Sequence, residues 1–282
     1  METPTARATR TALSARTALP VLVTLAGLLA LSGCDGPDRG SGGGAGSAAA
    51  ADRARSVRAN PDRADPSRTG LDRTHPDRTR PERPRARSVD PARIPGVGER
   101  LRRRIPADSR QVVAVYGDGR NSADSTVVLY ARRGAAWERI RDWPAHNGKK
   151  GWTTDHHEGD GRSPVGVFTL TDAGGVLADP GTRLPYTRSA GFAAPRWWAR
   201  SHWHDFDYVI AIDYNRVRGT APNDPARPEG GVRGGGIWLH LDHGSGTSAC
   251  VGLSRAAMEY LLRTLAPDRH PVVVMGDRAH LG

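Results

Sequence analysis

Aromatic residues are absent from the first 115 positions of this 282-residue chain. Its 7 Trp, 6 Tyr and 3 Phe all lie at or after Tyr116. A segment without aromatic side chains cannot bury much of a core, so a folded domain at the start of the chain is excluded. The remaining part, roughly 180–190 residues long, is sufficient for one domain with a core of its own.

The charge of the chain is unevenly distributed. The whole sequence has a formal net charge of +11, but residues 107–282 carry 21 basic and 19 acidic side chains. Nine of the eleven excess positive charges therefore lie before residue 107, ahead of most of the segment predicted to fold. A high isoelectric point usually suggests nucleic-acid binding, and this distribution removes that argument. We expect no nucleic-acid partner.

The longest apolar run lies near the start, at 18–31, and follows Arg7, Arg10 and Arg16. A basic region, an apolar run and small residues before a break are typical of a secretory signal, which we place at 1–33. The run ends in Leu-Ser-Gly-Cys at 31–34, which resembles a bacterial lipobox. That resemblance implies lipid on Cys34 and an extracytoplasmic protein anchored in the cell membrane, facing the cell wall. A plain signal peptide and an uncleaved anchor are the alternatives, although the run is short for a bilayer span.

Residues 34–90 have no periodic apolar pattern. They are rich in Gly at first, then in Ala, and then in repeated Pro, Asp and Arg. Such composition predicts a disordered tether. The domain is therefore predicted at 91–282.

Short runs of β-branched and aromatic residues dominate the predicted domain. They indicate strands at 111–116, 126–131, 136–143, 165–171, 208–214, 236–242 and 271–275, separated by Gly and Asn clusters. A short helix is expected at 99–105. A longer one should begin after Ser254, because Met258, Leu261, Leu262 and Leu265 follow at helical spacing. The fold class is mainly β with one or two helices.

Cysteine is nearly absent: the chain has only Cys34 and Cys250. Two cysteines in an exported protein ordinarily suggest one disulfide. A lipid on Cys34 would exclude that bond and leave a thiol at Cys250. A thiol outside the cytoplasm is prone to oxidation, so its presence calls for a reason, and catalysis is the simplest one.

His240 precedes Cys250 by ten residues, a spacing that allows the two side chains to meet. In a strand over 236–242, Leu239 would face the core while Trp238 and His240 face the other way. A loop over 241–249 would then bring the Cys250 thiol beside the His240 imidazole, which can generate an attacking thiolate. The backbone N–H groups of Ala249 and Cys250 are candidate oxyanion donors. A buried inert thiol is the alternative.

The same segment also contains a possible zinc ligand set: His240, His243, Cys250 and Asp242. Residues three apart on a strand point to opposite faces, so this set would need a bend in the loop. We therefore expect no metal and no cofactor, and place His243 as a turn residue that lines the site.

The segment resembles the signature of L,D-transpeptidase catalytic domains (the YkuD type). That signature has a strand histidine followed by a Ser/Thr-His-Gly-Cys box and an aliphatic residue. Here residues 247–251, Thr-Ser-Ala-Cys-Val, occupy the box, and Ser-Pro-Val-Gly-Val-Phe at 163–168 matches a second landmark of the family. The resemblance covers most of 91–282. It implies an L,D-transpeptidase-like β-sandwich.

The resemblance also implies a function in cell-wall biogenesis and cell shape: acyl transfer on peptidoglycan stem peptides by a monomer. Cys250 would be the nucleophile and His240 the base, with Ala249, Thr247 and Ser248 ordering the loop. Transpeptidation and carboxypeptidation remain open. A zinc-dependent wall hydrolase and a non-catalytic wall-binding lipoprotein are the rival hypotheses.

Three positions depart from the family pattern. Ser248 replaces the box histidine, Ala249 replaces the glycine, and Gly252 replaces an arginine that often follows the cysteine. If position 249 needs a positive φ, alanine would cost about 1 kcal/mol. Arg233 is a candidate substitute for the missing arginine, as are Arg162 and Arg255, and Trp238 is expected to line the site.

The other histidines are predicted to be unremarkable. We expect His156 and His157 to lie in a solvated loop, although a cleft rim is the alternative. His202 and His204 lie among three tryptophans, at 197, 198 and 203, for which packing is the default interpretation.

Overall fold

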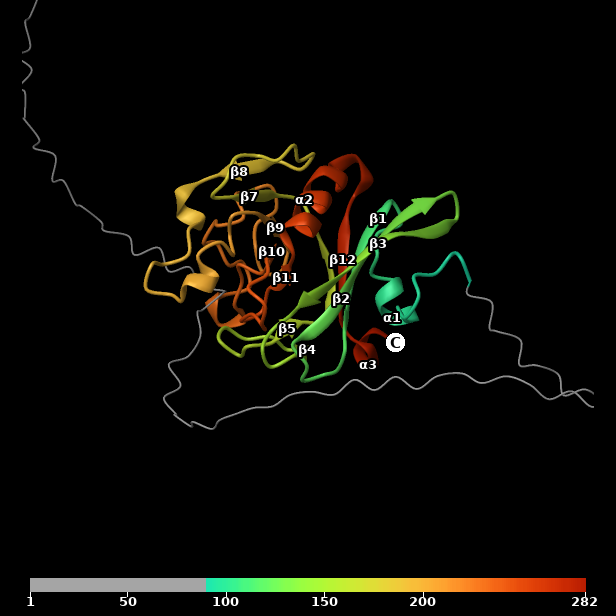
Figure 1. Ribbon diagram of the computed structural model, residues 1–282. Helices are drawn as coiled ribbons and strands as arrows, with labels where there is room; N and C mark the ends of the chain where they lie inside the picture. The colour runs from blue at the N-terminus through green and yellow to red at the C-terminus, as the bar shows by residue number, and fades with distance from the viewer. Residues whose placement is uncertain (1–89) are drawn as a thin grey trace, which may run out of the picture. The chain divides into compact units, whose positions relative to one another are not determined.

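The computed structural model describes residues 90–282 (Figure 1). The predicted signal at 1–33, the lipidation of Cys34 and all but the last residue of the tether lie outside this part of the chain. None of the helices in residues 90–282 has the length and apolarity that crossing a bilayer requires.

The described chain is mainly β, as predicted, with twelve strands and three α-helices. The strands are β1 (Gln111–Gly117), β2 (Asp124–Arg133), β3 (Ala136–His146), β4 (Trp152–Thr153), β5 (Ser163–Pro164), β6 (Gly166–Thr169), β7 (Ala173–Gly175), β8 (Tyr186–Arg188), β9 (Val209–Ala211), β10 (Trp238–Leu241), β11 (Val251–Leu253) and β12 (Val272–Asp277). The helices are α1 (Glu99–Arg102), α2 (Arg255–Thr264) and α3 (Arg278–Leu281).

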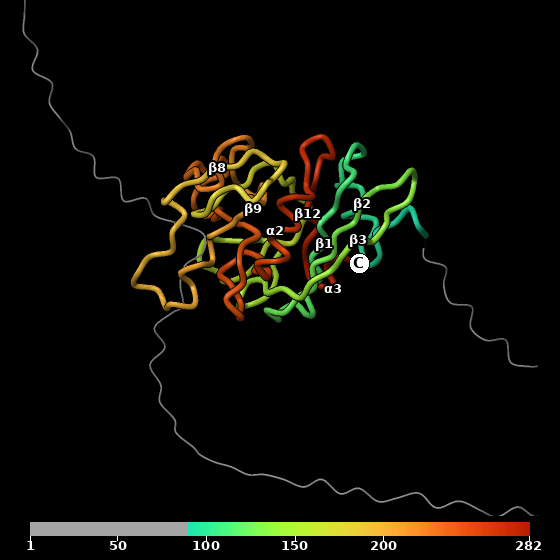
Figure 2. The backbone as a smooth tube through the Cα atoms, turned by 45° about the horizontal axis from the view of Figure 1, so that its top comes forward, coloured from blue at the N-terminus to red at the C-terminus, as the bar shows by residue number. Residues whose placement is uncertain are grey.

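Ten strands form one mixed sheet in the order β6-β12-β1-β2-β3-β11-β10-β9-β7-β8, and β4 pairs with β5 separately. The meander β1-β2-β3 and β12 lie on one side of the domain, and β7 to β10 lie on the other (Figures 1 and 2). β11 joins the two groups, because it pairs with β3 on one edge and with β10 on the other. The main core lies between these groups and includes the buried face of α2.

Helix α2 begins and ends where the sequence predicts. The Ser254 side chain accepts a hydrogen bond from the backbone N–H of Ala257, which satisfies one of the donors exposed at a helix start. Met258, Leu261 and Leu262 are buried against the sheet. The chain leaves the helix at Leu265, shortly before Pro267, which could not continue it.

The strands that the sequence analysis does not anticipate are all short. β4, β5, β7, β8 and β11 have two or three residues each, too few for an alternating pattern to be visible. The predicted strand at 208–214 shortens to β9, and α1 ends three residues before its predicted limit. The expected one or two helices become three because α1 and α3 are single turns.

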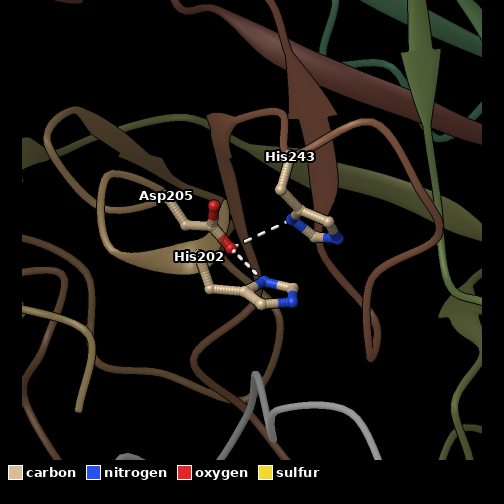
Figure 3. Close-up of side chains that lie close together, drawn as sticks. All are labelled: His202, Asp205 and His243. Atoms are coloured by element: carbon tan, nitrogen blue, oxygen red, sulfur yellow. Dashed lines mark hydrogen bonds and ion pairs between the residues drawn. The ribbon is translucent and has the colours of Figure 1, made fainter. Parts of the chain in front are cut away.

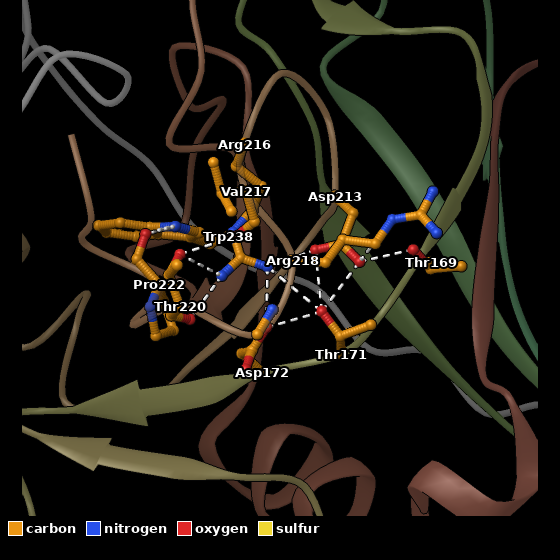
Figure 4. A network of polar contacts seen from close by, with 11 residues as sticks. Thr169, Thr171, Asp172, Asp213, Arg216, Val217, Arg218, Thr220, Pro222 and Trp238 are labelled. Atoms are coloured by element: carbon orange, nitrogen blue, oxygen red, sulfur yellow. Dashed lines mark hydrogen bonds and ion pairs between the residues drawn. The ribbon is translucent and has the colours of Figure 1, made fainter. Parts of the chain in front are cut away.

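A buried arginine organises the loop that follows β9 (Figure 4). The Arg216 guanidinium forms ion pairs with Asp172 and Asp213, and all three side chains are almost fully buried. Asp213 also accepts hydrogen bonds from Thr169 and Thr171. These contacts fix the loop at 213–222, and β10 forms a hydrogen bond to the end of this loop.

A single side-chain hydrogen bond connects β10 to this loop. The indole Nε1 of Trp238 donates to the carbonyl oxygen of Pro222, at 3.2 Å. Because Trp238 is two residues before His240, the arginine network contributes to the placement of the strand that carries the candidate base.

We expect Arg216→Met to reduce the free energy of unfolding by about 3–5 kcal/mol, because it leaves two buried carboxylates without their cation. Urea unfolding monitored by circular dichroism measures this. Arg218→Met is the matched control: Arg218 approaches the same Asp213 at 3.9 Å but is 67% exposed, so its loss should cost less than about 1 kcal/mol. Equal losses for the two variants would contradict the structural role of the network.

Candidate active site

Pairing of β10 with β11 determines which side chains share a face. The two strands are parallel, with Leu239 beside Val251 and His240 beside Gly252. Leu239 and Val251 belong to the main core, whereas Trp238 and Cys250 belong to a second apolar cluster on the opposite face. The alternation predicted from the sequence is confirmed. His240 therefore projects on the same side of the sheet as Cys250, two positions further along the ladder.

The ring of His240 is oriented by its own backbone. Its Nδ1 lies 2.7 Å from the carbonyl oxygen of Leu241. A carbonyl oxygen can only accept, so Nδ1 carries the hydrogen and Nε2 presents a lone pair. This Nε2 atom is buried and has no hydrogen-bond partner among residues 90–282. A buried nitrogen lone pair without a partner is costly to keep and is suited to accepting a proton.

Burial also sets the charge of this histidine. Removal from water disfavours the imidazolium and lowers the pKa of His240, although the negative charge of Asp205 acts in the opposite direction. The resting imidazole is therefore neutral at neutral pH. It is suited to act as a general base, and a thiolate would form by proton transfer to it rather than beside a pre-existing cation.

Cys250 is fully buried, with an exposed fraction of 0%. Its cluster includes Phe192, Trp198, Phe206 and Trp238. The Sγ atom lies 3.4 Å from the backbone nitrogen of Trp238 and 3.7 Å from the carbonyl oxygen of Gly236. A buried thiol is the alternative that the sequence leaves open, and this enclosure agrees with it.

The sequence predicts a free thiol at Cys250 if Cys34 carries lipid. The structure instead has Cys250 in a disulfide. A disulfide sulfur is not a nucleophile, so cysteine chemistry at this position requires the reduced form.

Two hydroxyl groups hold the loop that ends at Cys250. Thr247 Oγ1 donates to the carbonyl oxygen of Cys250 at 2.7 Å. Ser163 Oγ donates to the carbonyl oxygen of Ala249 at 2.7 Å and accepts from the backbone N–H of Gly148 at 2.9 Å. Ser163 opens the Ser-Pro-Val-Gly-Val-Phe landmark, so this motif positions the cysteine loop from a distant part of the chain.

The glycine of that landmark has a steric role. A Cβ added at Gly166 would lie 2.6 Å from the ring of Phe168, closer than carbon atoms can approach. Phe168 in turn packs against the main core and meets Tyr214 edge to face. Glycine is therefore required at this position by the aromatic ring two residues later.

The departures at 249 and 252 have structural explanations. Ala249 is not among the non-glycine residues with positive φ in residues 90–282, so alanine avoids the cost that the sequence analysis attaches to such a backbone. At Gly252, an added Cβ would lie 2.8 Å from Asp242 Oδ1. The Asp242 carboxylate therefore occupies the space where a larger side chain would begin.

The zinc ligand set considered from the sequence does not assemble. Asp242 Oδ1 lies 2.9 Å from His146 Nδ1, and His240 Nδ1 is bonded to the backbone. His243 instead meets Asp205, as their Nδ1 and Oδ2 atoms are 3.0 Å apart. The four proposed ligands thus have separate partners.

A different cluster lies beside the candidate pair, formed by His202, Asp205 and His243 (Figure 3). Both imidazoles direct Nδ1 at the same carboxylate oxygen, Asp205 Oδ2, each at 3.0 Å. Burial acts to lower the pKa of His243, but Asp205 outweighs it and raises that pKa. From the sequence, His202 is expected to serve in packing, and no pattern points to Asp205, because 38 residues separate Asp205 from His243 in the chain.

The candidate arginines are engaged by their own chain. Arg233 Nε lies 3.2 Å from Glu229 Oε2, and Arg162 donates to Asn121 Oδ1 at 2.9 Å. Arg255 Nη2 lies 2.5 Å from Asp207 Oδ2. Arg233 also lines a cavity of about 430 Å³ whose lining includes neither Cys250 nor His240.

His156 lines the same cavity as Arg233 and is buried, which corrects the prediction of a solvated loop. Its Nδ1 lies 3.1 Å from Asp160 Oδ2. Burial lowers the pKa of His156 against the opposing effect of Asp160. Only His157 is half exposed, as expected.

Comparison with known proteins identifies the family. The model of the L,D-transpeptidase catalytic domain (YkuD) matches residues 120–274, more than half of the chain, so this protein belongs to that family. The matched region contains both the Ser163 landmark and the His240–Cys250 pair. None of the curated proteins compared with the chain matches it.

Two solved structures show a distant likeness. Bd1075 of Bdellovibrio bacteriovorus is 17% identical with a TM-score of 0.35, over 59% of this chain and 48% of that one. The helical cell shape determining protein Pgp2 of Campylobacter jejuni is 18% identical with a TM-score of 0.36, over 60% of this chain and 48% of that one. The chain thus spans about half the length of each.

We expect Ser163→Ala to reduce the free energy of unfolding by about 1–3 kcal/mol, because it leaves the Gly148 N–H and the Ala249 carbonyl without their buried partner. Chemical denaturation measures the loss. Ser122→Ala is the control: the Ser122 hydroxyl accepts from the N–H of Asp124 within an exposed turn, so its loss should stay within about 0.5 kcal/mol. A Ser163 variant as stable as the control would refute the bridging role.

Proposed function

We propose that this protein is a cysteine-dependent L,D-transpeptidase that acts on peptidoglycan stem peptides. The observation that carries the proposal is the buried, unpartnered Nε2 of His240 on the face of the sheet that also holds Cys250. Family membership supports the reaction class, because the matched domain is a catalytic one.

In the proposed reaction the Cys250 thiol loses its proton to His240 Nε2, and the sulfur attacks the carbonyl carbon of the third stem residue. The oxyanion is held by the backbone N–H groups of Ala249 and Cys250. The C–N bond then breaks, and the leaving D-alanine nitrogen takes the proton back from His240. A thioester remains on Cys250.

The second half of the reaction restores the thiol. The side-chain amine of a neighbouring stem attacks the thioester carbonyl and loses a proton through His240 to the departing sulfur, which forms a cross-link. Water in place of the amine would give a trimmed stem. The neutral state of His240 serves both halves, because the same Nε2 accepts a proton and returns it.

Two features of the described structure set conditions for this reaction. Cys250 takes part in a disulfide in the structure, so this bond must be reduced before the sulfur can attack. The sulfur must also become accessible, because the apolar cluster that includes Trp198 and Phe206 encloses it completely. Substrate can reach it only when part of this cover shifts.

We expect one carbapenem molecule to add to the reduced wild-type chain, because the β-lactam carbonyl presents the same electrophile to the Cys250 thiolate. Intact-protein mass spectrometry after reduction and drug exposure measures the adduct. Cys250→Ala should show none. His240→Gln keeps the size of the side chain but removes the base, so the adduct should form at least about 100-fold more slowly.

His204→Gln is the control for that series, because His204 is exposed and bonded to Asp207; it should react like the wild type. An equal adduct on Cys250→Ala would exclude the proposed nucleophile. Binding to isolated cell walls with neither adduct nor product would favour the non-catalytic alternative instead.

We also propose that the chain is exported and anchored by lipid on Cys34. A lipid on Cys34 and a disulfide from Cys34 to Cys250 exclude each other, because both use the same sulfur. Mass spectrometry of protein extracted from membranes should show a chain that starts at Cys34 and carries acyl groups. The anchor would be contradicted by a soluble chain that an alkylating reagent modifies only after reduction, at both Cys34 and Cys250.

A further inference from the structure

The cluster of His202, Asp205 and His243 has the composition of a metal site (Figure 3). Its three donor atoms all lie within 4.8 Å of one another. The side chains of Asp205 and His243 are 5% and 6% exposed, and that of His202 is 13% exposed. The donors are thus enclosed on the protein side and open to solvent only near His202.

A hydrogen bond explains the contact of His202 with Asp205 but not the contact of His243 with Asp205. His202 Nδ1 forms a regular hydrogen bond with Asp205 Oδ2. His243 Nδ1 lies equally close to that oxygen, at 3.0 Å. It nevertheless has no hydrogen-bond partner of acceptable geometry within residues 90–282. This buried nitrogen thus approaches the carboxylate at ion-pair distance but off the direction of a hydrogen bond, and a metal ion that both atoms bind would account for that geometry.

The spacing is suited to a small divalent cation. Nitrogen and oxygen ligands bind Zn²⁺ at about 2.0–2.2 Å in a tetrahedral arrangement, which places them roughly 3.3–3.5 Å apart. The observed separations of 3.0 Å need to widen by only a few tenths of an ångström. Two imidazoles and one carboxylate suit zinc and its neighbours among the transition metals.

We propose that His202 Nδ1, Asp205 Oδ2 and His243 Nδ1 bind a divalent transition-metal ion of the zinc class, with a fourth position open to solvent. This site differs from the set considered from the sequence, since it includes neither His240 nor Cys250. It uses no residue to which the proposed acyl transfer assigns a chemical step.

The bound ion would connect two segments that otherwise meet through side chains. His202 and Asp205 follow Trp198 in the segment that packs over the Cys250 face, and His243 belongs to the loop between β10 and β11. Phe206, next to Asp205, contacts the rings of both Trp238 and His240. A metal at this point would therefore stabilise the cover over Cys250.

The test is equilibrium dialysis of the full-length Cys250→Ser chain against Zn²⁺, with metal analysis of the dialysed protein. The serine variant removes the thiol, which could bind zinc by itself. We expect one zinc per chain, and at least about a tenfold loss of affinity in His202→Asn. His204→Asn is the matched control, since His204 is two residues away and paired with Asp207; it should bind like the parent.

Two further measurements keep the test decisive. Thermal unfolding should show a midpoint several degrees higher with Zn²⁺ in the parent and the His204 variant, and no shift in the His202 variant. His202 is the more exposed ligand, so its variant answers the question even if His243→Asn fails to fold. Co²⁺ should give visible bands without a thiolate charge-transfer band in the wild-type chain.

The proposal is overturned if zinc fails to bind at one per chain, or if His202→Asn binds it like the parent. A cobalt–thiolate band that disappears in Cys250→Ser would place the ion on Cys250 and also overturn it. None of these results bears on the carbapenem adduct, which is measured in the presence of a chelator.

Discussion

The parallel pairing of β10 with β11 is the constraint on which the candidate site depends. It places Leu239 and Val251 in the main core and turns His240 and Cys250 to the opposite face. A one-residue shift of β10 in this register would turn Leu239 away from the core and His240 into it. The hydrophobic core therefore fixes the geometry of the base and the sulfur, without any direct bond between them.

Contacts from distant parts of the chain then stabilise this pairing. Ser163 holds the carbonyl of Ala249, Thr247 holds that of Cys250, and the loop organised by Arg216 supports Trp238. Each contact buries a polar group that would be costly to leave without a partner. The family landmark at 163–168 thus has a physical purpose: it links the start of β5 to the loop that ends at the cysteine.

Much of the fold and the central pair could be predicted from the sequence. Alternation of Leu239 and His240 assigns the two faces, and helical spacing after Ser254 locates α2, because both signals are local. The cluster around Asp205 could not be predicted, because its members approach one another only through tertiary packing. Burial of Cys250 is only one of two alternatives from the sequence, because its cover comes from Phe192 and Phe206, which no spacing rule connects to position 250.

The central claim is that His240 is a neutral base whose bare nitrogen is Nε2. Nitrogen NMR of the reduced chain with ¹⁵N-labelled histidine, assigned by comparison with His240→Gln, measures which ring nitrogen carries hydrogen. The account predicts a neutral ring at pH 7, with hydrogen on Nδ1 and none on Nε2. A ring protonated on Nε2, whether neutral or cationic, would contradict it.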